Sequence, residues 1–300
     1  MESEIMDLQD AFKKSTNVRP FYHQAPRWIR VAFRLGGALS PSLAAKLATR
    51  LFFTTQRRAA SRTGAEALAR GRRVKAGQLA VWSWGDGPVV LLVHGWNGRA
   101  SQLSRFIEPL VDRGYRVVAF DAPAHGESPG KQTTIPEMVG ALQQVSAELG
   151  EIHGVIAHSM GGAATLLAIT EGLDIERAVL IAPPSDPALF VTHFARALGL
   201  SQELERRLRV NIERRAGRRL EELRVDRLTP RRPQPLLVIH DEDDSQVPIE
   251  HGVSIVETWP NASLVATRGL GHRRILGDAY VNKRSVGFID APLRADRTAA

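Results

Sequence analysis

Short, almost uninterrupted apolar runs separated by helix-length segments constrain the fold of this 300-residue chain more than any other feature. Strands that are buried on both faces give such runs, and they occur in parallel sheets that helices cover on both sides. The pattern therefore predicts an α/β fold with a mostly parallel, doubly wound sheet. The expected strands are Val89 to Val93, Val117 to Phe120, Gly154 to Ala157, Ala178 to Ala182, Leu236 to Ile239 and Ser263 to Ala266.

Two other segments suggest how the chain is divided. Residues 1–76 are expected to form a basic, helical N-terminal extension, with two helices between Arg27 and Thr55 that are broken near Ser40 and Pro41. Residues 77–300 are expected to form the α/β domain, which begins with an edge strand from Gln78 to Trp84. The segment from about residue 183 to residue 235 is too long for an ordinary connection, so a small helical insertion is expected there.

The net charge of +8 is spread unevenly along the chain. Residues 1–75 hold 15 Lys and Arg against 5 Asp and Glu, whereas the remaining 225 residues hold 25 against 27. A basic segment that also carries apolar residues either packs as helices on the domain or makes peripheral contact with an anionic membrane. In the insertion, 11 arginines and 6 acidic residues lie between Glu203 and Arg232. They form either a solvated, ion-paired helix face or a lid that attracts anions.

Simple observations exclude several classes of protein. The chain has no cysteine, which excludes disulfide frameworks, zinc-thiolate sites and cysteine nucleophiles. Ile152 to Thr170 is the longest uncharged stretch, but its histidines and adjacent glycines argue against a membrane span. The acidic start, Met1 to Asp10, does not resemble a secretory signal, so a cytoplasmic location is expected. The basic segment has no nucleic-acid-binding motif, so nucleic acid is not an expected partner.

Ser159 stands where an apolar strand turns into a helix-forming segment. Such a strand-to-helix turn, the nucleophile elbow, requires small neighbours, and Gly161 and Gly162 provide them. The usual motif is G-x-S-x-G, and here Ala157 stands at the first glycine. The alternative is a serine that only caps a helix. The pattern favours Ser159 as a nucleophile exposed above the sheet.

A serine nucleophile needs a base, and the base needs an acid that orients it. Asp244 and His272 each follow a predicted strand, at the carboxyl edge where α/β sheets place their sites. We therefore expect Asp244 to orient the imidazole of His272. Asp243 is the main alternative acid, and Asp241 and Glu242 are more distant ones.

Acyl transfer also requires backbone donors for the oxyanion. The glycine-rich turn His94-Gly95-Trp96 directly follows the strand from Val89 to Val93. Its Trp96 N–H and the Met160 N–H after the nucleophile are the expected oxyanion hole.

In combination and order, these motifs resemble the α/β-hydrolase fold superfamily, particularly its small bacterial esterase-like members. The resemblance extends from about Leu79 to the end of the domain and includes the turn from Asp121 to Ser128, for which we expect a structural role. It implies a triad of Ser159, Asp244 and His272, with the insertion as a lid over the pocket. The sequence departs from the pattern at Asp241 and Ala124, where many relatives have glycine.

The expected function is a serine hydrolase that cleaves an ester or thioester of a small molecule through an acyl-enzyme, with neither cofactor nor metal. The competing hypothesis is a membrane-surface or protein-interaction module on the same scaffold, in which catalysis is secondary or absent. Perhydrolysis, acyl transfer and carbon–carbon bond hydrolysis use the same triad, so the sequence does not separate them. It also does not indicate an oligomeric state.

Overall fold

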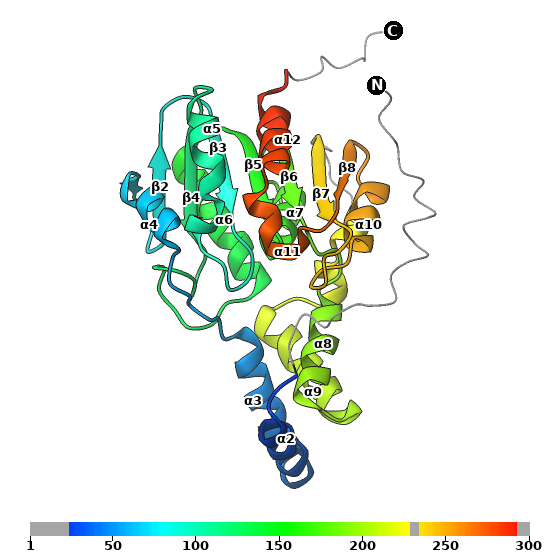
Figure 1. Cartoon of the computed structure of the whole chain (residues 1–300). Coiled ribbons are helices and arrows are strands. Elements are labelled where there is room, and N and C mark those ends of the chain that lie inside the picture. Colours follow the sequence, from blue (N-terminus) through cyan, green and yellow to red (C-terminus); the bar gives the residue numbers. More distant parts are fainter. Residues whose placement is uncertain (1–23, 229–233, 293–300) are drawn as a thin grey trace.

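The computed structural model describes residues 24–228 and 234–292, and one eight-stranded sheet forms its centre (Figure 1). The strand order is β1-β2-β4-β3-β5-β6-β7-β8; β2 pairs antiparallel with both of its neighbours, and the other pairs are parallel. The expected α/β class and mostly parallel sheet are confirmed. The strands are β1 (Arg72–Val74), β2 (Ala80–Trp84), β3 (Val89–Val93), β4 (Arg116–Asp121), β5 (Ile152–His158), β6 (Ile175–Ile181), β7 (Leu236–Asp241) and β8 (Ala262–Thr267).

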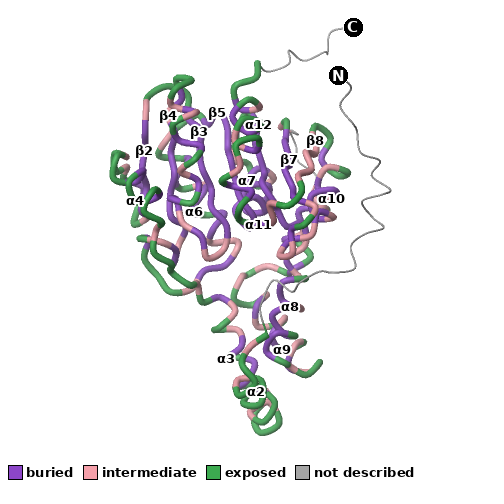
Figure 2. The backbone as a smooth tube through the Cα atoms, viewed as in Figure 1, coloured by how far each residue is buried: buried purple, intermediate pink, exposed green. Residues whose placement is uncertain are grey.

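Helices cover both faces of the sheet because successive strand residues point to opposite sides. Val89, Leu91 and Val93 of β3 join one core with α6 (Ile135–Leu149), α7 (Met160–Thr170) and α10 (Glu250–Thr258). Val90 and Leu92 join a second core with η1 (Ala100–Phe106), α5 (Ile107–Val111) and α12 (Ala279–Asp290). Figure 2 shows the central strands as buried, which explains why their sequences are apolar throughout.

The N-terminal edge of the sheet differs from the expected one. The predicted edge strand, Gln78 to Trp84, corresponds to β2, which is not at the edge because β1 pairs along its outer side. All five residues of β2 are buried, and its apolar side chains join the cores on both faces of the sheet. β1 has three residues, two of them exposed arginines, so neither its length nor any apolar alternation marks it in the sequence. The sheet therefore begins at Arg72, ahead of the domain boundary expected at residue 77. The helix before it, α4 (Arg62–Ala69), packs in the second core.

The expected pair of N-terminal helices packs mainly on the insertion and not on the sheet. The helices are α2 (Arg27–Leu39) and α3 (Pro41–Phe53), which are broken at Ser40 as predicted. The insertion supplies α8 (Ala188–Leu198), α9 (Gln202–Ala216) and the short turns η2 (Leu220–Leu223) and η3 (Val225–Arg227). We call α2, α3, α8 and α9 the four-helix cap. It has its own core, which includes Phe33, Ala44, Ala45, Ala48, Phe194, Leu204, Leu208 and Ile212.

Small residues bring the helices of the four-helix cap close together. A Cβ atom at Gly37 would lie 2.5 Å from Leu204 Cδ1, and Ala45 and Ala48 of α3 are fully or almost fully buried in the shared core. Three parts of the expected units lie outside the described residues: 1–23 of the extension, 229–233 of the insertion and 293–300 of the domain.

Most described arginines of the insertion are paired with carboxylates. Arg215 pairs with Glu137 of α6, and Arg218 pairs with Glu171 just after α7, so both tie the insertion to the sheet domain. Arg206, Arg207, Arg209, Arg219 and Arg224 pair with acidic residues of the insertion itself. These contacts favour the ion-paired helix face over a lid that attracts anions, because the positive charges are already matched.

Candidate active site

Ser159 occupies a tight turn between β5 and α7. Its backbone angles are φ 54° and ψ −126°, which L-residues adopt rarely and which the surrounding structure must hold in place. Its N–H donates to Ile181 O at 2.8 Å. At Gly161 a Cβ would lie 2.5 Å from His94 O and 2.7 Å from Val93 O. The turn therefore requires glycine there, as the motif predicted.

The structure brings Ser159, His272 and Asp244 together at the carboxyl ends of β5, β7 and β8. His272 Nε2 lies 2.9 Å from Ser159 Oγ, and His272 Nδ1 lies 2.6 Å from Asp244 Oδ2. The three residues are 5–6% exposed. With a proton on Nδ1 donated to Asp244, a neutral His272 has Nε2 free to accept the hydroxyl proton of Ser159. This arrangement is the geometry of a serine nucleophile with its base and orienting acid.

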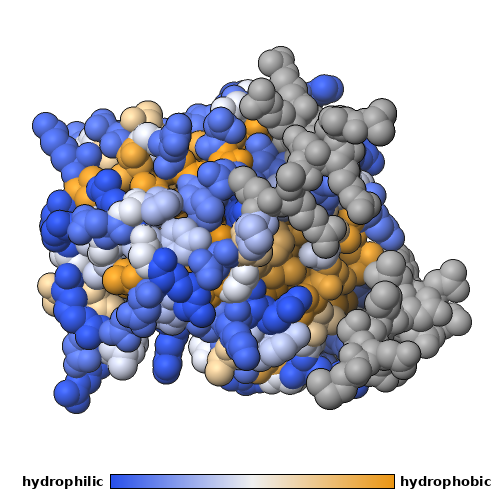
Figure 3. All heavy atoms as spheres, turned by 90° about the horizontal axis from the view of Figure 1, so that it is seen from above, coloured by the Kyte–Doolittle hydropathy of each residue, from blue (hydrophilic) through white to orange (hydrophobic). Residues whose placement is uncertain are grey.

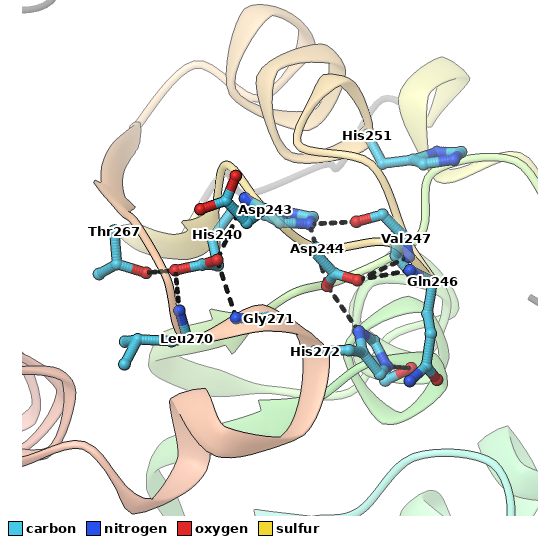
Figure 4. A network of polar contacts seen from close by, with 12 residues as sticks. His240, Asp243, Asp244, Gln246, Val247, His251, Thr267, Leu270, Gly271 and His272 are labelled. Atoms are coloured by element: carbon cyan, nitrogen blue, oxygen red, sulfur yellow. Dashed lines mark hydrogen bonds and ion pairs between the residues drawn. The ribbon is translucent and has the colours of Figure 1, made fainter. Parts of the chain in front are cut away.

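Asp244 is held as an anion by several donors, which Figure 4 shows around it. Its Oδ1 accepts from the N–H groups of Gln246 at 2.8 Å and Val247 at 2.9 Å. Burial alone would raise its pKa, but the hydrogen bond from His272 and the surrounding charges and donors outweigh this and lower the pKa. An ionised Asp244 is suited to stabilise a positively charged His272.

The other three residues of the acidic run have separate roles. Asp241, at the end of β7, accepts from the N–H groups of Leu270 at 3.1 Å and Gly271 at 2.8 Å, and from the hydroxyl of Thr267 at 2.7 Å. Asp243 accepts from Gly269 N–H at 2.9 Å. Glu242 points to Arg268. None of these three is bonded to His272, and Asp241 and Asp243 fix the loop that carries it.

Two buried histidines flank His272 and Asp244. His158 donates from Nε2 to the carbonyl oxygen of His272 at 2.9 Å, and burial is the main cause that lowers its pKa to about 3. His240 donates from Nε2 to Val247 O at 2.8 Å, and burial lowers its pKa to about 4. Both rings are therefore neutral at pH 7. His158 thereby positions the backbone of His272.

The turn after β3 lies directly against Ser159. A Cβ at Gly95 would come within 2.7 Å of Ser159 Cβ and 3.0 Å of His158 O, so only glycine fits. In the described part of the chain, the Trp96 N–H donates to no protein acceptor. The Met160 N–H, the first amide of α7, has no acceptor within its helix. Both amides are thus available where the sequence placed the oxyanion donors.

Two neutral histidines fix the geometry of this turn. His94 donates from Nδ1 to Gly95 O at 2.7 Å and accepts at Nε2 from Ala122 N–H at 3.0 Å. His125 accepts at Nε2 from Asn97 N–H at 3.0 Å. Burial lowers the pKa of His94 to about 4 and that of His125 to about 3, so each ring keeps its acceptor nitrogen at pH 7.

The turn from Asp121 to Ser128 is hydrogen-bonded, as expected from its residues. Asp121 accepts from Ala100 N–H at 2.7 Å and from Glu127 N–H at 2.8 Å. The Ser128 hydroxyl donates to the Asp121 carbonyl at 2.5 Å. Ala124, where many relatives have glycine, has φ 67°, a backbone conformation that glycine adopts without strain.

An apolar pocket adjoins the candidate oxyanion donors. It encloses about 520 Å³, part of it open to solvent, and Thr134 is the only polar residue in its lining. The lining comes from the four-helix cap and the residue before α8, the turn η2, the starts of α6 and α7, and the oxyanion turn: Phe52, Phe53, Trp96, Thr134, Ile135, Pro136, Met160, Pro187, Phe190, Ile212, Ala216, Leu220 and Leu223. Within residues 24–228 and 234–292, no group of three or more His, Asp or Glu is arranged to hold a metal ion.

The sequence profile of the alpha/beta hydrolase family matches residues 90–281, which is more than half of the chain. The chain belongs to the alpha/beta hydrolase family. This membership agrees with the strand order and with the position of Ser159 after β5. The family match leaves out the N-terminal helices, which contribute Phe52 and Phe53 to the pocket.

Curated relatives of this hydrolase match over short segments. A serine hydrolase-like protein of Homo sapiens is 36% identical over 93 residues, which are 29% of this chain and 45% of that protein. The pimeloyl-[acyl-carrier protein] methyl ester esterase of Methylococcus capsulatus is 47% identical over 51 residues, 17% of this chain and 20% of that protein. Each match spans less than half of the relative's length.

Solved structures of hydrolases match over most of the chain. Est1E from Butyrivibrio proteoclasticus, with ferulic acid bound, has a TM-score of 0.56 and 21% identity, and the match covers 73% of this chain and 96% of that one. A monoacylglycerol lipase of Paleococcus ferrophilus has a TM-score of 0.55 and 22% identity, over 71% and 98% of the two chains. At these identities the matches show a shared fold alone.

Sequence reasoning missed the residues that support the site. Asp241 was weighed only as a less suitable acid, although as the last residue of its strand it lies beside the neighbouring strand's loop. The hydrogen bonds that hold His94 and His125 in place leave no mark in a single sequence. The pocket residues Phe52 and Phe53 are far from the motifs along the chain, and only the packing of the four-helix cap brings them to the site.

Proposed function

We propose that the protein is a serine hydrolase that cleaves carboxylic esters of apolar acids through an acyl-enzyme. In this mechanism Ser159 Oγ attacks the ester carbonyl while its proton moves to His272 Nε2. Asp244 stabilises the resulting imidazolium, and the N–H groups of Trp96 and Met160 bind the oxyanion. His272 then protonates the leaving alcohol. Water, deprotonated by His272, attacks the acyl-enzyme and releases the acid and free Ser159.

The continuous contact from Ser159 through His272 to Asp244, at 2.9 and 2.6 Å, is the observation that carries this proposal. The electrostatic setting supports it, because Asp244 is ionised while the neighbouring rings of His158 and His240 are neutral. Neither of these two rings therefore competes as a cation with His272 for the carboxylate. Relatives named as a methyl ester esterase and a monoacylglycerol lipase act on the same class of bond.

The pocket supports an apolar acyl group as the part of the substrate that binds there. The Thr134 hydroxyl already accepts from Glu137 N–H at 3.2 Å as the helix cap of α6, so the lining holds few polar partners for a substrate. A carboxylate placed in such a lining would lose its hydration without a replacement. A thioester of an apolar acid would fit the same pocket and react with the same groups.

The test combines covalent labelling with matched substitutions. A fluorophosphonate should label Ser159, and Ser159→Ala should abolish both labelling and turnover while the melting temperature stays within a few degrees. Ser245→Ala, on the loop beside Asp244, is the matched control and should keep both. Labelling elsewhere, or turnover by Ser159→Ala, would refute the assignment. An unlabelled, inactive wild-type protein would favour the non-catalytic module.

The acyl preference is tested with nitrophenyl esters. Hexanoyl and octanoyl esters should be cleaved, and an ester of equal chain length that ends in a carboxylate should have a lower kcat/KM by on the order of tenfold or more. Equal kcat/KM values for the two esters would show that the acyl group does not enter the apolar pocket.

A further inference from the structure

The outer side of α2 and α3 exposes a concentration of large apolar side chains. Among the described residues, seven of the ten most exposed large hydrophobic residues lie on these two helices. The most exposed are Leu39 at 88%, Trp28 at 72% and Leu43 at 67%. The seven follow one another at three- and four-residue spacing, which places them on one side of each helix: Trp28, Val31, Leu35, Leu39, Leu43, Leu47 and Leu51.

This apolar stripe is separate from the core of the four-helix cap. Phe33, Ala44, Ala45 and Ala48 belong to that core and are at most 7% exposed. Helices of folded domains ordinarily turn their apolar side inward, whereas α2 and α3 carry apolar side chains on both sides. Figure 2 shows α2 as mostly exposed, at the end of the molecule where Figure 1 places it beyond the insertion. Nothing in the described chain covers the stripe.

The cations around the stripe are unbalanced. Residues 27–62 contain eight Lys and Arg and no Asp or Glu. Arg27, Arg30, Arg34, Lys46 and Arg50 are exposed on α2 and α3, and none pairs with a described carboxylate. The insertion arginines differ, because most of them are neutralised by acidic partners. The α2–α3 face therefore combines apolar side chains with free positive charge.

We propose that this face, Arg27 to Phe53, docks on the surface of an anionic lipid bilayer. Apolar side chains would enter the headgroup region and the cations would pair with lipid phosphates, the combination that interfacial helices use. A second copy of the chain fits less well, because symmetric pairing through this face would bring like charges together. Both helices have 13 residues, and no helix among the described residues is long and apolar enough to cross a bilayer.

Docking in this way would place the membrane beside the helix that reaches the pocket. The stripe runs along α3 to Leu51, and the next two residues, Phe52 and Phe53, line the pocket. An acyl ester held in the bilayer would then be close to the site. This consequence rests on the proposed ester hydrolase function, whereas docking itself does not.

The test measures binding of the full-length chain, carrying Ser159→Ala, to vesicles of phosphatidylglycerol and phosphatidylcholine. We expect the chain to co-sediment with these vesicles. Less of it should co-sediment when the vesicles contain phosphatidylcholine alone or when the salt concentration is high. The triple variant Trp28→Ser, Leu35→Ser and Leu39→Ser should bind weaker by on the order of a hundredfold. Arg27→Gln with Arg34→Gln should cost on the order of tenfold. A truncation is less suitable, since starting near residue 76 would also remove β1.

Matched controls use exposed residues elsewhere. Val210→Ser with Tyr280→Ser removes apolar side chains that are 50% and 54% exposed, and Lys283→Gln with Arg284→Gln removes two cations of α12. Both should bind vesicles like the parent. Figure 3 shows the end of the molecule away from α2, where hydrophilic side chains lie around several hydrophobic areas. The stripe variant in an otherwise native chain should keep its circular dichroism and its turnover of a soluble ester, and should lose turnover of a vesicle-embedded one.

Three results would overturn the proposal. Failure of the parent to sediment with anionic vesicles would exclude docking. Equal binding by the stripe variant and the control variants would show that the chain binds vesicles through a surface other than the α2–α3 face. A stable dimer in sedimentation velocity that the stripe substitutions dissociate would identify a second copy as the occupant. An inactive but vesicle-bound protein would refute the hydrolase function while leaving docking intact.

Discussion

Four consecutive acidic residues, Asp241 to Asp244, differ in function because the backbone turns between them. Only Asp244 reaches His272, while Asp241 and Asp243 accept hydrogen bonds from the loop that carries it. Acidic side chains that are neighbours in the sequence therefore have different hydrogen-bond partners and different roles. Asp241 replaces a glycine of many relatives, and its bonds to Leu270 and Gly271 explain what a carboxylate contributes there.

Substitution of the acidic residues separates these roles. Asp244→Asn should lower kcat by on the order of 10⁴, because the amide cannot stabilise the imidazolium and favours the wrong tautomer. Asp243→Asn keeps an acceptor for Gly269 N–H, so its kcat should stay within about tenfold of wild type. Steady-state kinetics with one nitrophenyl ester provides the comparison. If Asp243→Asn is the crippled variant, the orienting acid has been misassigned.

At the scale of elements, the distance between α7 and the turn after β3 sets the candidate oxyanion hole. Glycine at positions 95 and 161 permits this contact, since a Cβ at either would touch backbone atoms that cannot move independently. The two N–H donors thus come from different elements. These elements can approach each other closely because Gly95 and Gly161 have no Cβ atom. Ser159, with its positive φ, lies between them.

Gly161→Ala should separate these elements. Its Cβ would lie 2.5 Å from His94 O, so relief requires α7 to shift from the turn. We expect a loss of about 1–3 kcal/mol in the free energy of unfolding. Loss of an oxyanion donor should lower kcat on the order of 10²–10³-fold. Gly140→Ala in α6 is the matched control, because no atom lies within 4 Å of its Cβ, and it should keep full activity. Full activity of Gly161→Ala would argue against the Met160 donor.

At the scale of the whole molecule, histidines that are buried in the neutral form make the stability of the fold depend on pH. His94, His125, His158 and His240 are at most 5% exposed, and burial lowers each pKa to about 3 or 4. Unfolding returns each to its ordinary value near 6.5, so the unfolded chain binds more protons between these values. Their contribution to the free energy of unfolding is complete above pH 6.5 and is lost as the pH falls from there toward the folded pKa values of about 3 or 4.

Acid should therefore destabilise the protein well before its carboxylates titrate. Between pH 7 and pH 5, the free energy of unfolding from denaturant titrations should fall by about 1–2 kcal/mol for each of these histidines. NMR of the imidazole nitrogens should show the four rings still neutral at pH 5. Asp244, whose pKa is lowered, adds a further loss only below its ordinary pKa of 3.8. A stability that is unchanged from pH 7 to pH 5 would contradict this account.

Local patterns in the sequence predicted the central strands of the sheet and the residues of the candidate site, but not the edge strand β1. A strand such as Val89–Val93 must be apolar when both faces are buried, and the elbow around Ser159 requires glycine at fixed positions. Both constraints act within a few residues, so one sequence displays them. The place after a predicted strand indicates the acidic run as a whole, and the resemblance to the α/β-hydrolase pattern implies Asp244 within it.

Only the tertiary structure decided how distant segments meet. The three-residue β1 exists because β2 offers an edge for pairing, and the N-terminal helices pack on α9 because both bury apolar side chains in one shared core. That packing also delivers Phe52 and Phe53 to the pocket and leaves the stripe from Trp28 to Leu51 exposed. Periodicity shows that a helix has an apolar side. Which surface covers that side depends on the free energy of contacts between segments far apart in the chain.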